Sequence, residues 1–428
     1  MPAPGRPLSG VRVADLTMIW AGPYGAKILA DQGAEVIKIE SPRAWDNIRT
    51  LIPPPIAPGE HWWNTNFYFH EYSRNKKSLT LDLRSDQGKE VFARLLKHCD
   101  VVIENYRTDV MDSLGLSYDW LREQKEDIIV VGMAGFGKTG PERDAVGYGP
   151  IIEMMSGMTS TSGYGDDGEP YKSGISYGDP IAGICAAAAV ATALIQRHRT
   201  GKGQFIDLAQ REVMSTMLGE FYMDWSMNRR LPEHIGTGHD WMAPHNVYSC
   251  VGDDEWIAIC VRTDEEWEGL KQVMGQPDWA EREEFGDQIL RWEHRDELDE
   301  LVGGWTATRT KTDIFAACRD QRIPSSPVWK MLEILREPHL KARKFYEPLR
   351  HPQVGIWMVH GWLWRTDGAG PCILAPAPDF GQHNAEILGG LLGMSSAEQA
   401  ALESAGIVAT RPDGIPLASE MPPTPSML

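Results

Sequence analysis

One aspartate stands immediately before a long run of small apolar residues, and it is the clearest candidate for chemistry in this chain. Asp179 lies in the stretch 173–183, and the segment 181–195 that begins just after it reads IAGICAAAAVATALI. The placement predicts a carboxylate at the mouth of a buried helix, beside a backbone packed too closely to admit bulky neighbours. A carboxylate held ionised in such a position can act as a nucleophile.

The pair Asp179-Pro180 also has a purely structural interpretation. An Asp side chain caps free N–H groups where a helix begins, and Pro fits the first helical position without losing a needed donor. Spacing alone favours this capping role. The two interpretations are compatible, because a helix N-terminus stabilises the anionic form that a nucleophilic carboxylate requires.

Composition excludes several classes of protein. The chain has 428 residues, an ordinary apolar fraction and a formal net charge of −18. This acidity disfavours nucleic acid as the main partner, because a phosphate backbone needs a basic surface. The first ten residues, MPAPGRPLSG, do not resemble a signal peptide. The run 181–195 is shorter than the roughly 20 residues that span a bilayer, so no membrane association is expected.

The cysteines and histidines give no pattern of a metal site. The six cysteines are scattered without a CxxC pair, and the twelve histidines form no HExxH motif. In a chain of this size such cysteines are typical of reduced thiols in the cytoplasm. We therefore expect a cytoplasmic protein with no metal.

The first 140 residues alternate between strand-like and helix-like segments. This alternation predicts an α/β fold with a parallel sheet covered by helices on both faces. The turn after the first strand reads TMIWAGPYG and lacks the GxGxxG pattern of dinucleotide-binding folds. The expected strands are 11–16, 35–39, 101–104 and 128–132, and the expected helices are 24–32, 87–97 and 118–124.

The pattern of apolar and polar residues changes near residue 246 and again near residue 350. Segments 247–251 and 256–260 are typical of two strands joined by a turn, and charged helical segments follow at 263–274 and 294–303. Residues 384–392 are expected to be the last helix. We therefore predict a large Rossmann-like domain in 1–224, a small α+β domain in 225–335, and a return to the large domain in 336–428.

Four stretches, together with a late one, resemble the class III CoA-transferase family, which includes formyl-CoA transferase and carnitine CoA-transferase. They occur in family order and cover nearly the whole chain. The stretches are PLSGVRVAD at 7–15 with AGP at 21–23, GAEVIKIE at 33–40, NKKSLTLD at 75–82 with VVIENYR at 101–107, GDPIAG at 178–183 with RTGKGQ at 199–204, and RIPSSPV at 322–328 through GQHN at 381–384.

The resemblance implies an enzyme that moves CoA from a donor acyl-CoA to a free carboxylic acid. Its nucleophile would be an aspartate, and Asp179 alone falls at that position. It also implies an interlocked-ring dimer in which two ring-shaped subunits pass through each other, so a homodimer is expected and a heteromer is possible. No cofactor would be tightly bound, because the CoA thioester is itself a substrate.

The resemblance further implies which residues touch CoA and the reacting acyl group. Arg84 and Arg107 are the credible phosphate partners, because a guanidinium offers a bidentate fork. Gly236, Thr237 and Gly238 would form a glycine loop that donates backbone N–H groups to the oxyanion. By position, the CoA contacts are Trp20, Ala21, Ser41, Leu81, Asp82, Leu83, Arg84, Asn105, Tyr106, Arg107, Ser113, Val146, Gly147, Tyr148 and Gly149.

The chain departs from formyl-CoA transferases at several of these positions. Those enzymes have Gln in place of Trp20 and basic residues in place of Ser41, Ser113 and Gly147. The phosphates must therefore be held differently, with Arg107, Lys76 and Lys138 as candidates. Trp20, Trp62, Trp63, Trp225 and Trp241 either line a large acyl site or belong to the core. The acyl-site interpretation favours a bulky or aromatic acceptor acid.

Two alternatives remain open. The same family contains α-methylacyl-CoA racemases, which use a His and an Asp as acid and base. The His position corresponds to Tyr148 here, and a Tyr with its ordinary pKa near ~10 replaces His poorly at neutral pH. The second alternative is that the chain is a non-catalytic subunit of a heteromeric transferase. The retention of Asp179 argues against this alternative.

Overall fold

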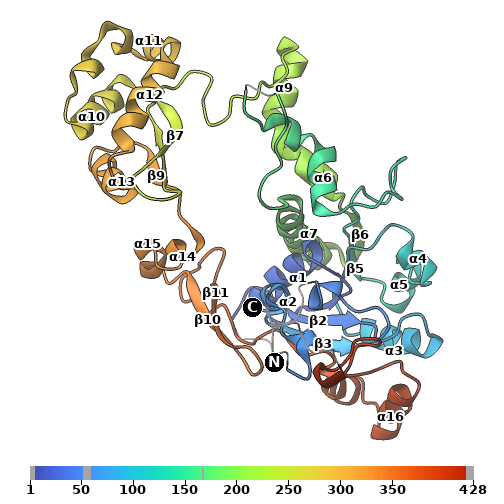
Figure 1. Cartoon of the computed structure of the whole chain (residues 1–428). Helices are drawn as coiled ribbons and strands as arrows, with labels where there is room; N and C mark the ends of the chain where they lie inside the picture. Colours follow the sequence, from blue (N-terminus) through green and yellow to red (C-terminus); the bar gives the residue numbers. More distant parts are fainter. Residues whose placement is uncertain (1–4, 52–58, 166–167, 421–428) are drawn as a thin grey trace. The chain divides into compact units, whose positions relative to one another are not determined.

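The computed structural model describes all residues except 1–4, 52–58, 166–167 and 421–428 (Figure 1). The chain divides into two compact units. The large unit comprises Met1–Thr159, Lys172–Arg229 and Ala342–Leu428, and the small unit comprises Ser160–Tyr171 and Arg230–Lys341. The large unit is therefore assembled from both ends of the chain.

The large unit is built on a six-stranded parallel sheet. Alternate residues of each strand face opposite sides, so Val13 packs in one apolar cluster and Ala14 in another. Both faces are thus buried, as parallel sheets require. In spatial order the strands are β3 (Lys76–Thr80), β2 (Glu35–Glu40), β1 (Arg12–Asp15), β4 (Val101–Glu104), β5 (Ile129–Gly132) and β6 (Gln204–Asp207).

Helices cover the two faces of this sheet. On one face α1 (Ala21–Asp31) packs with α7 (Gly178–Thr200), and on the other α3 (Asp86–Leu96) packs with α5 (Tyr118–Gln124). The remaining helices between residues 60 and 230 are short. They are α2 (Phe67–Ser73), α4 (Val110–Ser113), α6 (Gly149–Ser156), α8 (Gln210–Ser215) and α9 (Gly219–Asn228).

The last part of the chain returns to the large unit and covers the edge strand β3. The Thr80 hydroxyl donates to the Ala409 carbonyl over 2.6 Å, and the Thr80 N–H donates to the Asn384 side chain over 2.9 Å. These contacts protect an edge that would otherwise expose unpaired backbone groups. The returning elements are β10 (Tyr346–His351), β11 (Gly355–His360), a π-helix (Glu386–Leu391) and α16 (Ser396–Ser404).

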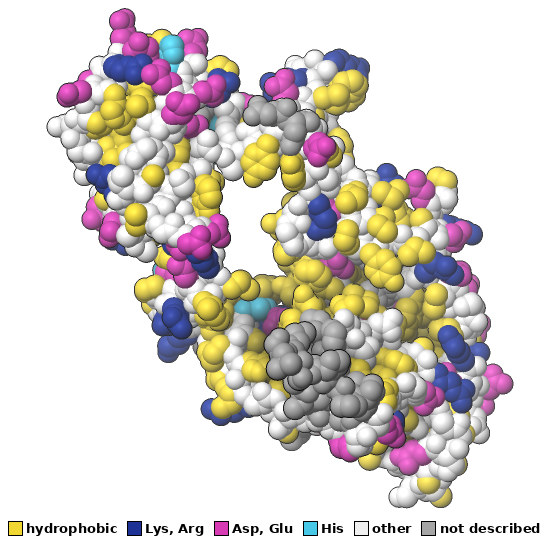
Figure 2. Space-filling model, viewed as in Figure 1, with side chains coloured by type: hydrophobic (Ala, Val, Ile, Leu, Met, Phe, Trp, Pro, Cys, Tyr) yellow, Lys and Arg dark blue, Asp and Glu magenta, His cyan; other side chains and the backbone are white. Residues whose placement is uncertain are grey.

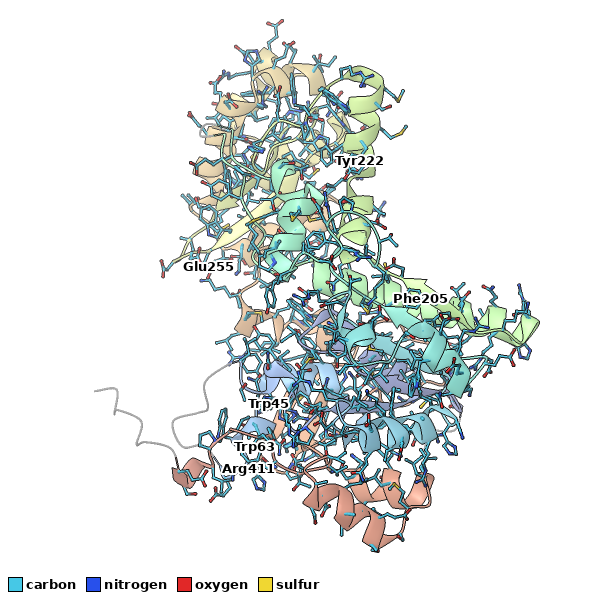
Figure 3. The ribbon with its side chains drawn as sticks, turned by 90° about the vertical axis from the view of Figure 1, so that its right-hand side faces the viewer. Trp45, Trp63, Phe205, Tyr222, Glu255 and Arg411 are labelled. Carbon is cyan, nitrogen blue, oxygen red and sulfur yellow. The ribbon has the colours of Figure 1, made fainter. Side chains whose placement is uncertain are left out.

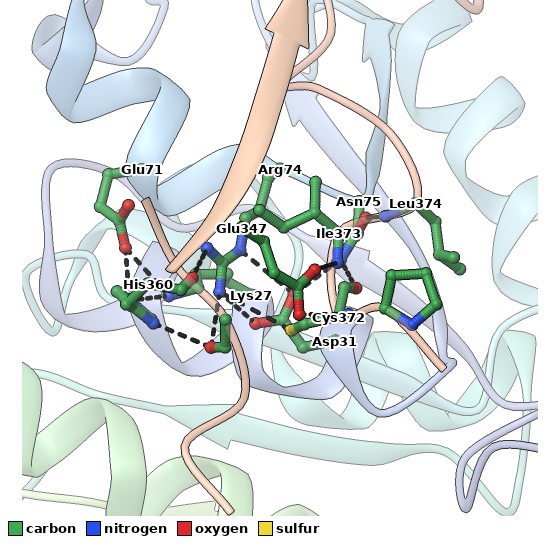
Figure 4. Close-up of polar contacts among 12 residues, drawn as sticks. Lys27, Asp31, Glu71, Arg74, Asn75, Glu347, His360, Cys372, Ile373 and Leu374 are labelled. Carbon is green, nitrogen blue, oxygen red and sulfur yellow. Dashed lines mark hydrogen bonds and ion pairs between the residues drawn. The ribbon is translucent and has the colours of Figure 1, made fainter. Parts of the chain in front are cut away.

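A buried polar network fixes the returning segment to α1 and α2 (Figure 4). Arg74 forms an ion pair of 2.9 Å with Asp31 and donates to the His360 carbonyl. Asn75 donates to the carbonyl of Cys372 over 3.0 Å. A second attachment is apolar, since Trp63 is fully buried with Phe380 and packs near Trp45 (Figure 3).

The small unit has its own apolar core. Its antiparallel sheet consists of β7 (His245–Ser249), β8 (Trp256–Cys260) and β9 (Ser325–Pro327). Its helices are α10 (Asp264–Met274), α11 (Gln288–Glu293), α12 (Arg295–Thr306), α13 (Lys311–Asp320) and α14 (Met331–Ile334), and α15 (Pro338–Ala342) ends at the boundary with the large unit.

Most expected elements occur within one to three residues of their predicted ends, but three expectations need correction. The predicted helix 384–392 is a π-helix at Glu386–Leu391, and it is not the last helix, because a capping box at Ser395 and Glu398 starts α16. Residues 160–171 belong to the small unit instead of the large domain. The unit boundaries lie at 229/230 and 341/342 instead of 224/225 and 335/336.

Charged side chains are buried where the strands of the sheet end. Arg49 makes a bidentate contact to Glu40 at 2.8 and 2.7 Å, with both side chains excluded from solvent. Lys76 pairs with Asp15 at 2.8 Å, also without exposure. Such pairs stabilise little compared with apolar residues, but breaking one leaves an uncompensated buried charge. These pairs tie the end of β1 to the start of β3 and the end of β2 to the loop that contains Arg49.

We expect Arg49→Met to destabilise the large unit by about 3–5 kcal/mol, because it leaves Glu40 buried and unpaired. The matched control is Arg107→Met, which removes the same bidentate geometry from the exposed pair with Asp109 and should leave the unfolding midpoint nearly unchanged. Denaturant unfolding of both variants measures the difference. Equal unfolding midpoints for the two variants would show that the buried Glu40 carboxylate does not need Arg49 for stability.

Among the described residues, one helix is long and apolar enough by composition to cross a bilayer, namely α7. Core helices of folded domains meet the same criterion. Here α7 packs along α1 through Ala182, Ala186 and Val190, all of which are buried. The helix therefore has a structural role inside the large unit.

Candidate active site

Asp179 is the second residue of α7 and lies partly buried within the large unit. It does not cap its own helix, which begins at Gly178 without a side-chain cap. Its carboxylate accepts a hydrogen bond from the N–H of Ala21 instead. Ala21 is the first residue of α1, whose initial N–H groups have no partner within that helix. The carboxylate thus joins the N-termini of two helices.

The N-terminus of α6 reaches the same carboxylate. Gly149 is the first residue of α6, and a Cβ at this position would overlap Asp179 Oδ2 and lie 2.5 Å from Ser176 Cβ. The backbone can come this close only because position 149 has no side chain. N-terminal residues of α1, α6 and α7 therefore surround one carboxylate, and helix N-termini favour negative charge.

A second close approach sets the spacing of α1 and α7. A Cβ on Gly183 would lie 2.7 Å from the Ala21 carbonyl, and one on Gly25 would lie 2.8 Å from the Gly183 carbonyl. A larger residue at either position would force the helices apart. Since α1 carries the N–H that binds Asp179, these glycines also hold the nucleophile candidate in place.

Burial raises the pKa of Asp179 to about 6, and the hydrogen bond from Ala21 opposes the rise only in part. No Lys or Arg of the described chain contributes to this pKa. At pH 7 a carboxyl group with this pKa is ionised in about nine molecules of ten. The carboxylate is then both available and poorly solvated, which are the properties of an activated nucleophile.

We expect any reaction that uses the Asp179 carboxylate as its nucleophile to slow below pH 6. Only the ionised carboxylate attacks, so the rate should drop about tenfold per pH unit below 6 and reach a plateau above pH 7. The pH profile of kcat/KM measures this. A plateau that extends down to pH 4.5 would mean that the carboxyl group keeps an ordinary pKa.

Aromatic side chains form a wall beside this carboxylate. Trp20, the residue before α1, stacks on Tyr72 with ring centroids 5.6 Å apart. Tyr72 also contacts Tyr24 and Tyr68 at 6.1 Å each. Burial and the Glu71 carboxylate raise the pKa of Tyr72, with a further contribution from Asp179. Tyr72 therefore stays neutral and lies near the reactive group.

A cavity of about 210 Å³ opens beyond the ends of strands β2, β3 and β4. In parallel α/β sheets, ligands bind outside the carboxyl ends of the strands. The lining contains seven of the residues expected to contact CoA, namely Ser41, Leu81, Asp82, Leu83, Arg84, Tyr106 and Ser113, together with Met18, Ile39, Ala44, Val110 and Leu114. These seven candidates thus lie around one cavity.

The other expected CoA contacts lie outside this lining. Ala21 adjoins Asp179, and Trp20 precedes Ala21 in the chain and stacks on Tyr72. Asn105 uses its side-chain amide to bind both backbone groups of Met18, at 2.7 and 2.8 Å. The Arg107 guanidinium pairs with Asp109. Val146 and Tyr148 are more than half exposed, and Gly147 and Gly149 adjoin Ile152 and Asp179 respectively.

Two of the alternative phosphate partners are already engaged. Lys76 is fully buried, binds Asp15 and the Pro23 carbonyl, and burial lowers its pKa to about 8. Lys138 pairs with the buried Glu104 at 2.8 Å. By contrast, Arg84 is among the residues that line the cavity, is exposed, and forms no ion pair within the described chain.

The expected glycine loop, Gly236–Gly238, lies in the small unit. It lines a separate open cavity of about 500 Å³ together with β7, β8 and β9. Gly236 has a φ of +59°, which an L side chain rarely adopts. The loop therefore has the backbone freedom expected of it, on a different unit from Asp179.

The tryptophans divide into three groups. Trp20 lies beside Tyr72. Trp62 and Trp63 are buried in the core, at 8% and 0% exposed, so for these two the core interpretation is correct. Trp225 and Trp241 are about half exposed. Of the five, only Trp20 contacts the aromatic wall in the described structure.

The residues that sequence reasoning missed are Tyr24, Tyr68 and Tyr72. Tyr24 lies on α1 close to Trp20 in sequence, whereas Tyr68 and Tyr72 lie on α2 and come beside Trp20 only through folding. The aromatic composition of segment 61–72 was the signal available. Within the described residues, no group of three or more His, Cys, Asp or Glu side chains is placed to hold a metal ion.

Comparison with known proteins decides the family. The model of CoA-transferase family III matches residues 8–384. The chain belongs to the class III CoA-transferases. As a member of this family it is an enzyme that transfers CoA to carboxylates.

Known proteins are similar to this class III CoA-transferase along most of their own length and most of its length. Succinyl-CoA–D-citramalate CoA-transferase of Chloroflexus aurantiacus is 33% identical over 95% of this chain and 99% of its own. The α subunit of a succinyl-CoA–L-malate CoA-transferase from Chloroflexus aurantiacus is 30% identical over 94% and 92%. A CAIB/BAIF family protein from Brucella suis has a similar structure, with a TM-score of 0.82, 31% identity, and coverage of 90% and 99%.

Proposed function

We propose that this enzyme transfers CoA between an acyl-CoA and a free carboxylic acid through a covalent intermediate on Asp179. One observation supports this most directly. A carboxylate with a pKa raised to about 6 lies where the N-termini of three helices meet, without a cationic partner. A carboxylate that served only to stabilise the fold would be expected to have a cation or several donors beside it.

The chemistry has four steps. Asp179 attacks the carbonyl carbon of the donor thioester, and the C–S bond breaks to give a mixed anhydride and CoA thiolate. The thiolate attacks the aspartyl carbonyl, releasing the donor acid and forming an aspartyl-CoA thioester. The acceptor carboxylate attacks this thioester and again releases thiolate. The thiolate then attacks the acceptor carbonyl, which yields the new acyl-CoA and restores Asp179.

Each tetrahedral intermediate places negative charge on an oxygen near Asp179. N–H groups at the start of α1 and α6 are oriented toward this region by the helices that carry them. Preorganised backbone donors of this kind stabilise a developing oxyanion. That the Gly236–Gly238 loop is a further donor stays a prediction from the resemblance.

We propose that the acceptor is a bulky or aromatic acid. The wall formed by Trp20, Tyr24 and Tyr72 supports this, as does the lack of a Lys or Arg contribution to the pKa of Asp179. A second carboxylate would be expected to require such a cation. In a competition assay, arylalkanoic or branched acids should be consumed before malate or succinate. A clear preference for a dicarboxylic acid would overturn the proposal.

We further propose a cytoplasmic homodimer. Large apolar side chains are exposed on the large unit, and hydrophobic patches of this kind usually mark interfaces (Figure 2). They include Ile151, Met154 and Met155 on α6, Ile184 and Ile195 on α7, and Tyr222, Met223, Trp225 and Met227 on α9. Light scattering should give twice the 47.8 kDa of the chain.

Hydroxylamine trapping tests the covalent intermediate. The protein is mixed with acyl-CoAs and hydroxylamine, and intact mass is measured for the native chain and for Asp179→Ala. A hydroxamate on the native chain alone is the expected result. No adduct with any donor would contradict the proposal. Exchange of the α-proton without an adduct would instead indicate a racemase, and neither reaction would indicate a non-catalytic subunit.

A further inference from the structure

A buried carboxylate lies one helical turn beyond the place where α6 meets Asp179. Glu153 of α6 is 1% exposed. It follows Gly149 by four residues, so the two face the same side of the helix. On that side Gly149 adjoins Ser176 and Asp179. Glu153 is therefore placed to act on the segment of chain that leads to the nucleophile candidate.

The Glu153 carboxylate holds this segment through two consecutive residues. Its Oε1 accepts hydrogen bonds from the Ser173 N–H at 3.1 Å and from the Ser173 hydroxyl at 2.7 Å. The hydroxyl also lies 2.5 Å from the Ile175 carbonyl, so its single proton is shared between two acceptors. Lys172 Nζ lies 3.9 Å from Glu153 Oε2 and donates to the Ser173 carbonyl at 2.7 Å. The carboxylate thus ties the start of the segment to α6.

The segment has little else to fix it. The chain leaves the large unit after Thr159 and returns at Lys172, seven residues before Asp179. Residues 172–177 form no helix or strand, and none of their side chains is buried. Apolar burial, which is the main stabilising contribution elsewhere in the fold, therefore adds little here. Without Glu153 the first turn of α7 would be held less firmly.

We propose that Glu153 is a positioning residue for Asp179. By fixing residues 172–177 to α6, it keeps the N-terminus of α6 against the reactive carboxylate. This role rests on the proposed function, since it requires Asp179 to be the nucleophile. Glu153 takes no part in the chemistry, so its role depends on an acceptor oxygen and not on negative charge.

The solvation of Asp179 reports whether this attachment holds. Burial raises the pKa of Asp179 to about 6, so a loosened segment that admits water should lower that pKa toward 3.8. Among the described residues, Lys172 faces Glu153, and Tyr72 lies near enough for Asp179 to help raise the pKa of its hydroxyl. Neither group is changed by a substitution at position 153.

Glu153→Leu and Glu153→Gln test the role of the acceptor oxygen. Leu removes it, whereas Gln keeps an oxygen that accepts from Ser173. We expect kcat to fall roughly 10- to 100-fold in Glu153→Leu, with KM for the acyl-CoA nearly unchanged, and to stay within about threefold of the native value in Glu153→Gln. Equal losses in the two variants would show that the charge matters, and a silent Glu153→Leu would show that no attachment is needed. Either result would overturn the proposal.

Ser173→Ala tests the same attachment without changing the buried residue, which guards against a Glu153→Leu chain that does not fold. It removes one hydroxyl donor and should lower kcat by roughly three- to tenfold. The matched control is Ser156→Ala, because the Ser156 hydroxyl bonds to the Glu153 carbonyl inside α6, at 2.7 Å. This control should stay within about twofold of the native kcat. Equal losses would contradict the proposal, since they would trace the effect to α6 itself.

Chemical labelling separates this role from the proposed function. A water-soluble carbodiimide reacts with protonated carboxyl groups, and peptide mass spectrometry follows labelling at Asp179 without any transfer. The midpoint should lie near pH 6 in the native chain and in Glu153→Gln, and roughly half a pH unit or more lower in Glu153→Leu. An unchanged midpoint in Glu153→Leu would overturn the positioning role. Expected midpoints without hydroxylamine trapping on the native chain would support the attachment and reject the covalent mechanism alone.

Discussion

Asp179→Asn should abolish CoA transfer and at the same time raise the thermal stability of the chain at pH 8. Asn has almost the same shape but cannot attack a thioester, and loss of a nucleophile typically lowers kcat by roughly 10⁴-fold or more. The stability gain follows from the pKa of Asp179, which burial raises from 3.8 to about 6. The folded enzyme thus holds a charge that it solvates less well than the unfolded chain does.

The sign of the pH dependence is fixed by this shift. Because the folded pKa is the higher one, the stability that the carboxyl group contributes is complete below pH 3.8 and is lost as the pH rises through 6. Asn carries no charge at any of these pH values, so the Asp179→Asn variant does not lose this stability. Its free energy of unfolding should exceed that of the native chain by about 1–3 kcal/mol at pH 8, and the difference should shrink toward pH 4. Thermal unfolding at both pH values measures it. A variant that is less stable at pH 8 would show that Asp179 serves the fold.

Gly149→Ala should lower the rate of transfer by roughly 100-fold, which is the typical effect of moving a reactive group by about 1 Å. A methyl group at position 149 has no room beside Asp179 Oδ2 and Ser176 Cβ, so the carboxylate or α6 must shift. KM for the acyl-CoA should change much less than kcat. The readout is steady-state kinetics together with the yield of hydroxamate.

Gly174→Ala is the matched control for this variant. Gly174 lies on the same segment as Asp179, and a Cβ there meets nothing within 4 Å. It should therefore behave as the native enzyme. If both substitutions were silent, the close approach of α6 to the nucleophile would have no bearing on catalysis.

The sequence predicted the parts of the fold that follow from apolar patterning. Segments 101–104 and 118–124 were placed at their observed ends as β4 and α5. Strands β3 and β6 were not recognised as strands, because KKSLT and QFID do not have an apolar pattern. In β3 the reason is specific, since Lys76 is buried only because Asp15 of β1 neutralises it, and such a long-range pair leaves no local signal.

The sequence selected candidate site residues, which stay predictions, but not their geometry. Resemblance selected Asp179 and placed seven CoA-contact candidates that line one cavity. The approach of Gly149 to the carboxylate, and the aromatic wall around Tyr72, depend on how separate elements pack. The grouping of residues 160–171 with the small unit likewise arises from contacts far apart in sequence.

The return of the chain to strand β3 has a consequence for biosynthesis. Thr80 of β3 bonds to Ala409, which is 329 residues later in the chain. During translation β3 therefore leaves the ribosome long before Ala409 can cover it. The nascent large unit must carry an unprotected sheet edge through most of translation, while the small unit, nearly continuous in sequence, can fold on the way. Slow synthesis of the last hundred residues should therefore promote aggregation, and chaperones that shield strand edges should raise the yield of soluble enzyme.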